Sequence, residues 1–139
     1  MDERKQKLLK QLEAYFQNNE DTEDVSLFTK EELGTSMDVL RALITGYGAY
    51  LTDVLAEFSF LPLQNTEILY FNTVLTIRVD VPGEGQAALS GAVSTLNFYL
   101  PYGSFAISRD GSILIYKSST AFPSDWDDKK LYELIETSI

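Results

Sequence analysis

The stretch that decides the fold is residues 87–119, AALSGAVSTLNFYLPYGSFAISRDGSILIYKSS. Its first half carries apolar side chains three or four residues apart, which is the pattern of a helix lying on a sheet or on another helix. That stripe consists of Leu89, Val93, Leu96 and Leu100. The chain must then turn, because Pro101 lacks the N–H that a helix needs and Gly103 can adopt the positive φ of a reversal.

The second half of this stretch predicts a tight hairpin. Apolar residues alternate with small or polar ones on either side of Asp110 and Gly111, and Asp-Gly is a favoured pair in two-residue hairpin turns. The alternating residues are Phe105, Ile107, Ile113 and Ile115. Two antiparallel strands are therefore expected after the helix and its corner.

One amide side chain stands inside the predicted helix. Asn97 follows Leu96, and a buried amide must find hydrogen-bond partners. We expect it to bond the backbone of the turn at 101–103. Asn97, Pro101 and Gly103 are thus predicted to form a structural corner rather than a catalytic site.

The N-terminal part predicts a helix followed by a polar connection. Residues 2–17 have the apolar spacing of an amphipathic helix, whereas residues 18–24 combine four carboxylates with turn formers. We expect the second segment to be an exposed acidic linker, since it lacks the spacing and the glycine of an EF-hand loop. Thr29 and Glu32 have the spacing of a capping box, within a segment, 25–34, that is otherwise expected to be irregular.

The middle of the chain predicts most of the sheet. Residues 37–48 fit either a helix or a strand that is buried on both faces, and the pattern leaves both open. Alternation over 54–61 and a long β-branched and aromatic run over 68–79 each predict a strand. The segment 82–85, PGEG, is expected to be a turn, because it lacks a phosphate-loop pattern and its glutamate would repel a phosphate.

The chain closes with another predicted helix. Ser124 and Asp127 have capping-box spacing. The apolar face of this helix consists of Trp126, Leu131, Leu134 and Ile135. The separated helix and strand patterns predict an α+β fold, a two-layer sandwich in the order α-β-β-β-α-β-β-α with one antiparallel five-stranded sheet covered by helices. We expect a single domain over 1–139, with its α+β core at 37–139.

Length and charge narrow the classes of function. A chain of 139 residues suits one domain with a sizeable core. Its 11 Lys and Arg stand against 21 Asp and Glu, so the net charge is −10. The resulting field repels phosphate backbones and anionic lipids, so neither nucleic acid nor a membrane is expected as a partner.

Two missing residue types exclude several chemistries. The chain has no Cys and no His. Disulfides, thiol nucleophiles, Ser-His-Asp mechanisms and the commonest zinc ligands are therefore excluded. The N-terminal segment is charged throughout and lacks the apolar core of a signal peptide, so the cytoplasm is the expected location.

The carboxylates have structural explanations. Asp125, Asp127 and Asp128 stand at a predicted helix N-terminus, where the helix dipole stabilises negative charge without a metal. Asp53 and Glu57 are four residues apart on a strand, which separates them by more than about 10 Å and argues against a glycosidase pair. We expect no catalytic residue, cofactor or metal, and a hydrolase using carboxylates alone is the least favoured hypothesis.

The order of elements, with LNFYLPYGSFAI leading into SILIYKSS, resembles the YbjN-like family of sensory-transduction regulators and its relatives with a type III secretion chaperone-like fold. The resemblance runs from about residue 54 to the C-terminus. Its centre is Leu96, Asn97, Pro101, Gly103 and Phe105. It implies that 37–48 is a strand and that the protein is small, acidic and often dimeric, and it transfers no catalytic residues.

The aromatic residues point to an interface. Eight Tyr, eight Phe and one Trp exceed what one small core requires, and clusters of exposed aromatics mark interfaces. The candidates are Tyr50, Tyr70, Phe71 and Tyr99. We predict a homodimer formed through an uncovered sheet face or edge.

Two hypotheses about function follow. The first is a non-enzymatic protein-binding module, chaperone-like or regulatory, that holds a segment of a protein or a peptide. The second is an immunity-type protein that neutralises a basic toxin, because an acidic surface speeds association with a basic partner.

Overall fold

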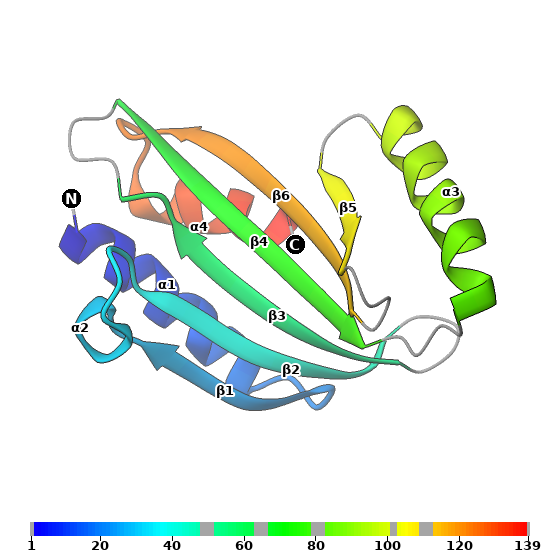
Figure 1. The fold of residues 1–139 in the computed structure, drawn as a ribbon. Coiled ribbons are helices and arrows are strands. Elements are labelled where there is room, and N and C mark those ends of the chain that lie inside the picture. Colours follow the sequence, from blue (N-terminus) through cyan, green and yellow to red (C-terminus); the bar gives the residue numbers. More distant parts are fainter. Residues whose placement is uncertain are drawn as a thin grey trace.

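The fold is one antiparallel sheet with two helices on one of its faces (Figure 1). The computed structural model describes residues 2–47, 52–62, 67–78, 83–100, 103–108 and 113–138. In chain order the elements are α1 (Asp2–Gln17), β1 (Thr22–Phe28), α2 (Lys30–Leu33), β2 (Val39–Tyr47), β3 (Thr52–Phe60), β4 (Ile68–Arg78), α3 (Gly83–Tyr99), β5 (Ser104–Ile107), β6 (Ile113–Pro123) and α4 (Asp128–Ser138). The strands lie in the order β1-β2-β3-β4-β6-β5. The predicted α+β class is confirmed, but the sheet has six strands rather than five.

The unpredicted strand is β1. The end of the expected linker, residues 22–24, belongs to it, and β1 pairs with β2 from Thr22 opposite Ile44 to Phe28 opposite Val39. Its charged residues are tolerated because β1 is an edge strand, with one side free of a neighbouring strand. Because these charged residues break the apolar alternation by which a strand is predicted, the prediction of a linker over 18–24 was wrong at its end.

The core lies between the sheet and the helices α1 and α4, which cover the same face (Figure 1). The helices contribute Leu8, Leu9, Leu12, Phe16, Leu131 and Ile135, and the strands contribute alternate residues, among them Leu40, Ala42, Ala56, Phe58, Phe60, Leu69 and Phe71. The rings of Phe16 and Phe58 stack at 5.3 Å between centroids, and those of Phe58 and Phe71 stack at 5.9 Å. Because side chains alternate along a strand, these residues fix which face of each strand meets the helices.

A charged contact joins the start of α1 to the start of α4. The Arg4 guanidinium donates to the Asp128 carboxylate at 2.6 Å and to the carbonyl oxygens of Ser124 and Trp126. Lys7 Nζ donates to the same carboxylate at 3.1 Å. The hydrogen bonds from Arg4 and then from Lys7 hold the pKa of Asp128 below its ordinary value.

Several predicted elements are confirmed. Residues 37–48, which the pattern left open, contain the strand β2, as the family resemblance implies. The helix predicted over 2–17 is α1, and the strands predicted over 54–61 and 68–79 are β3 and β4. The Thr29 hydroxyl accepts the N–H of Glu32 at 3.3 Å and caps α2, whereas the turn between β5 and β6 lies outside the described residues.

Two predicted helix boundaries were wrong. The expected turn at 82–85 includes Gly83 and Gly85, which lie in the first turn of α3, where backbone N–H groups need no partner within the helix. Ser124 does not cap α4; Asp127 does, since its carboxylate accepts the N–H of Lys130 at 2.8 Å. The second boundary was wrong because the cap was assigned to Ser124, three residues before the residue that caps the helix.

The second face of the sheet carries no helix within the part of the chain that the structure describes. The third long helix, α3, packs against the edge strand β5 and stands beyond the sheet rather than over it (Figure 1). The predicted covering of the sheet by helices therefore holds for one face. The other face and the outer side of α3 are the surfaces that remain open.

Candidate interaction surfaces

The outer end of α3 exposes three large apolar side chains, which we call the α3 patch: Leu96, Phe98 and Tyr99. Phe98 is 81% exposed, Tyr99 76% and Leu96 50%. The rings of Phe98 and Tyr99 meet edge to face at 5.1 Å between centroids. Single exposed apolar residues are common on proteins, but a contiguous group of them marks an interaction surface.

The inner side of α3 is fixed to β5 by Asn97. Its Nδ2 donates to the carbonyl of Phe105 at 2.8 Å, and its Oδ1 accepts the N–H of Phe105 at 2.7 Å. The amide thus satisfies both outward-facing backbone groups of one edge residue, as a neighbouring strand would. The expected partner was the turn at 101–103, so the predicted lock joins α3 to the strand after that turn instead.

The predicted helix stripe is corrected at one position. Toward the end of α3 the half-buried residues are Leu89, Val93 and Asn97, followed by Leu100 directly after the helix, whereas Leu96, which the stripe included, is half exposed. Spacings of four, four and three put the first set on one side of the helix. Asn97 takes the place assigned to Leu96 because its two hydrogen bonds to β5 require the inner side.

Of the other two predicted corner residues, the structure describes Gly103. Gly103 has φ +78°, and a Cβ added there would collide with the ring of Tyr116, so this position requires glycine on two grounds. Pro101 lies outside the described residues. The sequence had signalled the reversal at Gly103 but not the aromatic ring against it.

The three predicted interface aromatics that the structure describes are not brought together. Tyr99 belongs to the α3 patch, and Tyr70 is half-buried on the open face of β4. Phe71 was wrongly predicted as an interface residue: it is only 1% exposed, because its place in the alternation of β4 points it into the core between Phe58 and Phe60. Tyr50 lies outside the described residues.

The open face of the sheet contains a groove of about 630 Å³, which we call the sheet groove. Its lining consists of Met37, Ser59, Asn72, Thr73, Val74, Gly103, Ser104, Lys117, Ser118 and Ser119. Strand register places Ser59, Asn72 and Ser119 in one row across β3, β4 and β6. A second row crosses β4, β6 and β5 and consists of Val74, Lys117 and Ser104. Sequence reasoning missed this groove.

Most of the side chains that line the sheet groove are polar. Hydroxyl and amide groups, which both donate and accept hydrogen bonds, make up most of the two rows. Among the described residues that line the groove, Lys117 is the charged one, although the whole chain carries a net charge of −10. The groove therefore favours a polar or negatively charged ligand more than the rest of the surface does.

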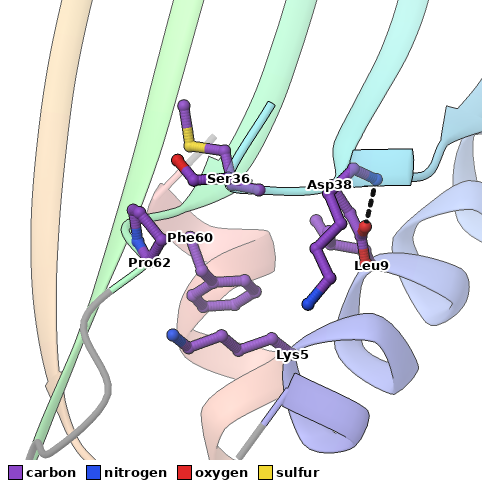
Figure 2. A pocket seen from close by; sticks show the side chains of 8 residues that line it. Lys5, Leu9, Ser36, Asp38, Phe60 and Pro62 are labelled. Atoms are coloured by element: carbon purple, nitrogen blue, oxygen red, sulfur yellow. Dashed lines mark hydrogen bonds between the residues drawn. The ribbon is translucent and has the colours of Figure 1, made fainter. Parts of the chain in front are cut away.

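A small cavity lies between α1 and the start of β2 (Figure 2). It is bounded by Lys5, Leu9, Lys30, Ser36, Met37, Asp38, Phe60 and Pro62. Lys5 is only 8% exposed, and its ammonium donates to the carbonyl of Leu61 at 2.9 Å, while Asp38 accepts the backbone N–H of Lys30 at 2.7 Å. At about 30 Å³ the cavity has room for about two water molecules, far below the volume of a substrate pocket.

Three of the candidate carboxylates have structural roles. Asp127 caps α4, Asp128 pairs with Arg4 and Lys7, and Glu57 accepts two hydrogen bonds from Arg41 across the strand pair. Across the described ranges, no group of three or more acidic residues is placed to hold a metal ion. Asp127, Asp128 and Glu57 are thus each engaged in a helix cap or an ion pair.

Comparisons with protein-family models, with curated proteins and with solved structures found no match for the chain. The surfaces described above are therefore interpreted from their own geometry and chemistry. Among the helices that the structure describes, none has both the length and the apolar character needed to cross a membrane.

Proposed function

We propose that this chain is a non-enzymatic protein-binding module, chaperone-like or regulatory, that holds an extended segment of a partner protein in the sheet groove. The observation that carries the proposal is the groove itself, which has a volume of about 630 Å³ and lies on the sheet face that α1 and α4 do not cover (Figure 1). The resemblance to YbjN-like regulators supports the same class. We place this activity in the cytoplasm, without a cofactor, and in a homodimer.

The two rows of the groove suggest how a segment is held. An extended peptide presents backbone N–H and C=O groups at regular intervals. In the first row Asn72 and Ser119, which are more exposed than Ser59, offer both donors and acceptors to them. Val74 supplies an apolar contact beside Lys117. The Lys117 ammonium donates only, so it selects a carboxylate on the segment.

Affinity capture from the native cell tests this proposal. The wild-type chain is compared with Asn72→Arg and Lys117→Glu, which block the groove and reverse its charge, and with Gln11→Arg on the exposed side of α1 as a control. A groove ligand is captured by the wild type and by the control and is lost from both groove variants. Equal capture by all four proteins contradicts the proposal.

A second candidate, an immunity-type protein that neutralises a basic toxin, is favoured by one surface feature. Four carboxylates at the start of β1 are exposed: Glu20, Asp21, Glu23 and Asp24. A basic partner bound there is released by high salt, because exposed charge pairs are screened. Glu20→Lys with Glu23→Lys abolishes its capture, whereas Lys117→Glu leaves it intact, so the same experiment separates the two functions.

A further inference from the structure

We propose that α3 pairs with α3 of a second copy of this chain in an antiparallel two-fold contact that buries Phe98 and Tyr99. This contact uses a different surface from the sheet groove. It specifies the surface of the homodimer named in the proposed function, and it can fail while segment binding in the sheet groove still holds.

The first support is the exposure of α3. Its inner side rests on β5 through Asn97, and its main contact with the rest of the fold is with that strand. Phe98 and Tyr99 point away from this anchor and expose most of their surface. Because the paired hydrogen bonds hold the helix at the sheet edge, α3 cannot fold over the open sheet face without breaking them.

The second support is charge, which favours a copy of the same chain over a basic partner. Two molecules with a net charge of −10 repel each other over most of their surfaces. Of the 17 residues of α3 only Glu84 is charged. A second copy can approach along this helix with little repulsion, whereas a basic protein gains no attraction from it.

The third support is complementary shape. Small exposed residues lie toward the start of α3: Ala87, Ala88, Gly91 and Ala92. A Cβ placed on Gly91 meets nothing within 4 Å, so this part of the helix is open to a large neighbour. In an antiparallel pair, Phe98 of each copy lies over Gly91 of the other, and the two-fold axis passes between residues 94 and 95. A two-fold contact of this kind is self-complementary and closes at a dimer.

The fourth support is area. Phe98 and Tyr99 on two copies are four aromatic side chains, each able to bury about 150–250 Å², or about 600–1,000 Å² together. A specific interface requires at least about 1,000 Å². The small exposed residues Ala87, Ala88, Gly91 and Ala92 supply the remainder along a helix of 17 residues, which is about 25 Å long.

Sedimentation equilibrium on the full chain tests the dimer. At micromolar concentration the wild type is expected to have the mass of two chains of 15.6 kDa. The double variant Phe98→Ser/Tyr99→Ser is expected to sediment as one chain, with its dissociation constant raised at least about thirtyfold. Tyr15→Ser on α1, where Tyr15 is also exposed, is the matched control and stays dimeric. A monomeric wild type, or a double variant that still dimerises, overturns the proposal.

Cross-linking tests the antiparallel geometry. Because the chain has no cysteine of its own, an introduced cysteine is its only thiol. Thr95→Cys places one thiol beside the expected two-fold axis and should give a disulfide-linked dimer on mild oxidation. Gln11→Cys on the exposed side of α1 should remain monomeric on a denaturing gel. A wild type that dimerises while Thr95→Cys fails to cross-link contradicts this arrangement of the helices. Circular dichroism on each variant confirms that it is folded.

Discussion

The hydrogen bonds of Asn97 make a prediction whose size follows from the structure. Asn97→Leu keeps the branched shape of the side chain but removes both bonds to Phe105, at 2.7 and 2.8 Å. A buried backbone group left without a partner costs about 1–3 kcal/mol. Phe105 is half-buried, so water satisfies part of the loss. We therefore expect the free energy of unfolding to fall by about 1–3 kcal/mol in total for the two groups.

Urea unfolding followed by tryptophan fluorescence measures this loss. With a slope of about 2 kcal/mol per molar urea, a loss of about 2 kcal/mol lowers the midpoint by about 1 M. The comparison is made in the Phe98→Ser/Tyr99→Ser background, so that changes at the proposed dimer contact do not alter the measured free energy of unfolding. Ser94→Leu, on the exposed side of α3, is the control and should change stability by less than about 0.5 kcal/mol.

Hydrogen exchange gives a second readout at the bond itself. The amide N–H of Phe105 should exchange faster in Asn97→Leu than in the control, because its acceptor is gone. An unchanged midpoint together with unchanged exchange at Phe105 would refute the idea that Asn97 fixes α3 to the sheet edge.

Three further predictions concern other parts of the fold. The pKa of Asp128 is lowered below 3.8 in the folded protein, so its ion pairs stabilise the fold above that pH and the benefit is lost as the pH falls through the lowered value. The stability difference between wild type and Asp128→Asn should therefore be constant above about pH 5 and shrink below pH 3.8 in acid titrations of unfolding. Gly103→Ala should lower the free energy of unfolding by at least about 1–2 kcal/mol, because residue 103 has a positive φ and lies against the Tyr116 ring. Gly83→Ala should leave the free energy of unfolding unchanged, and thermal unfolding of both variants measures the difference. Phe58→Ala removes the middle ring of the stacked core and should cost about 3–5 kcal/mol by urea unfolding, and a loss under about 1 kcal/mol contradicts the core assignment.

Local periodicity was enough for the elements that carry their own hydrophobic pattern. The helix α1 and the strands β3 and β4 were predicted from single segments, because their buried sides repeat at the period of the element. The strand β1 could not be found in this way. Its residues pair with β2 through backbone groups, and Glu23 and Asp24 remain exposed, so tertiary pairing rather than side-chain pattern makes it a strand.

The candidate surfaces were harder to predict because they depend on register. A shift of one residue separates Phe71, which is buried, from Tyr70 on the open face, and no composition rule tells the two apart. The row of Ser59, Asn72 and Ser119 joins residues from three strands, and only the pairing of β3, β4 and β6 brings them side by side. The exposure of Phe98 likewise follows from where α3 stands, beyond the sheet edge, rather than from its own sequence.

The two edges of the sheet explain why the open face and α3 are the surfaces to consider for partners. An unpaired edge strand invites another strand to add to it. At β1 the N–H of Leu27 already donates to the Glu13 carboxylate of α1 at 3.0 Å, and at β5 both backbone groups of Phe105 are taken by Asn97 of α3. A helix side chain thus occupies a position at each edge where an added strand would have to bond. Strand addition must first displace Glu13 or Asn97, whereas the sheet groove and the outer side of α3 can be reached without breaking either contact.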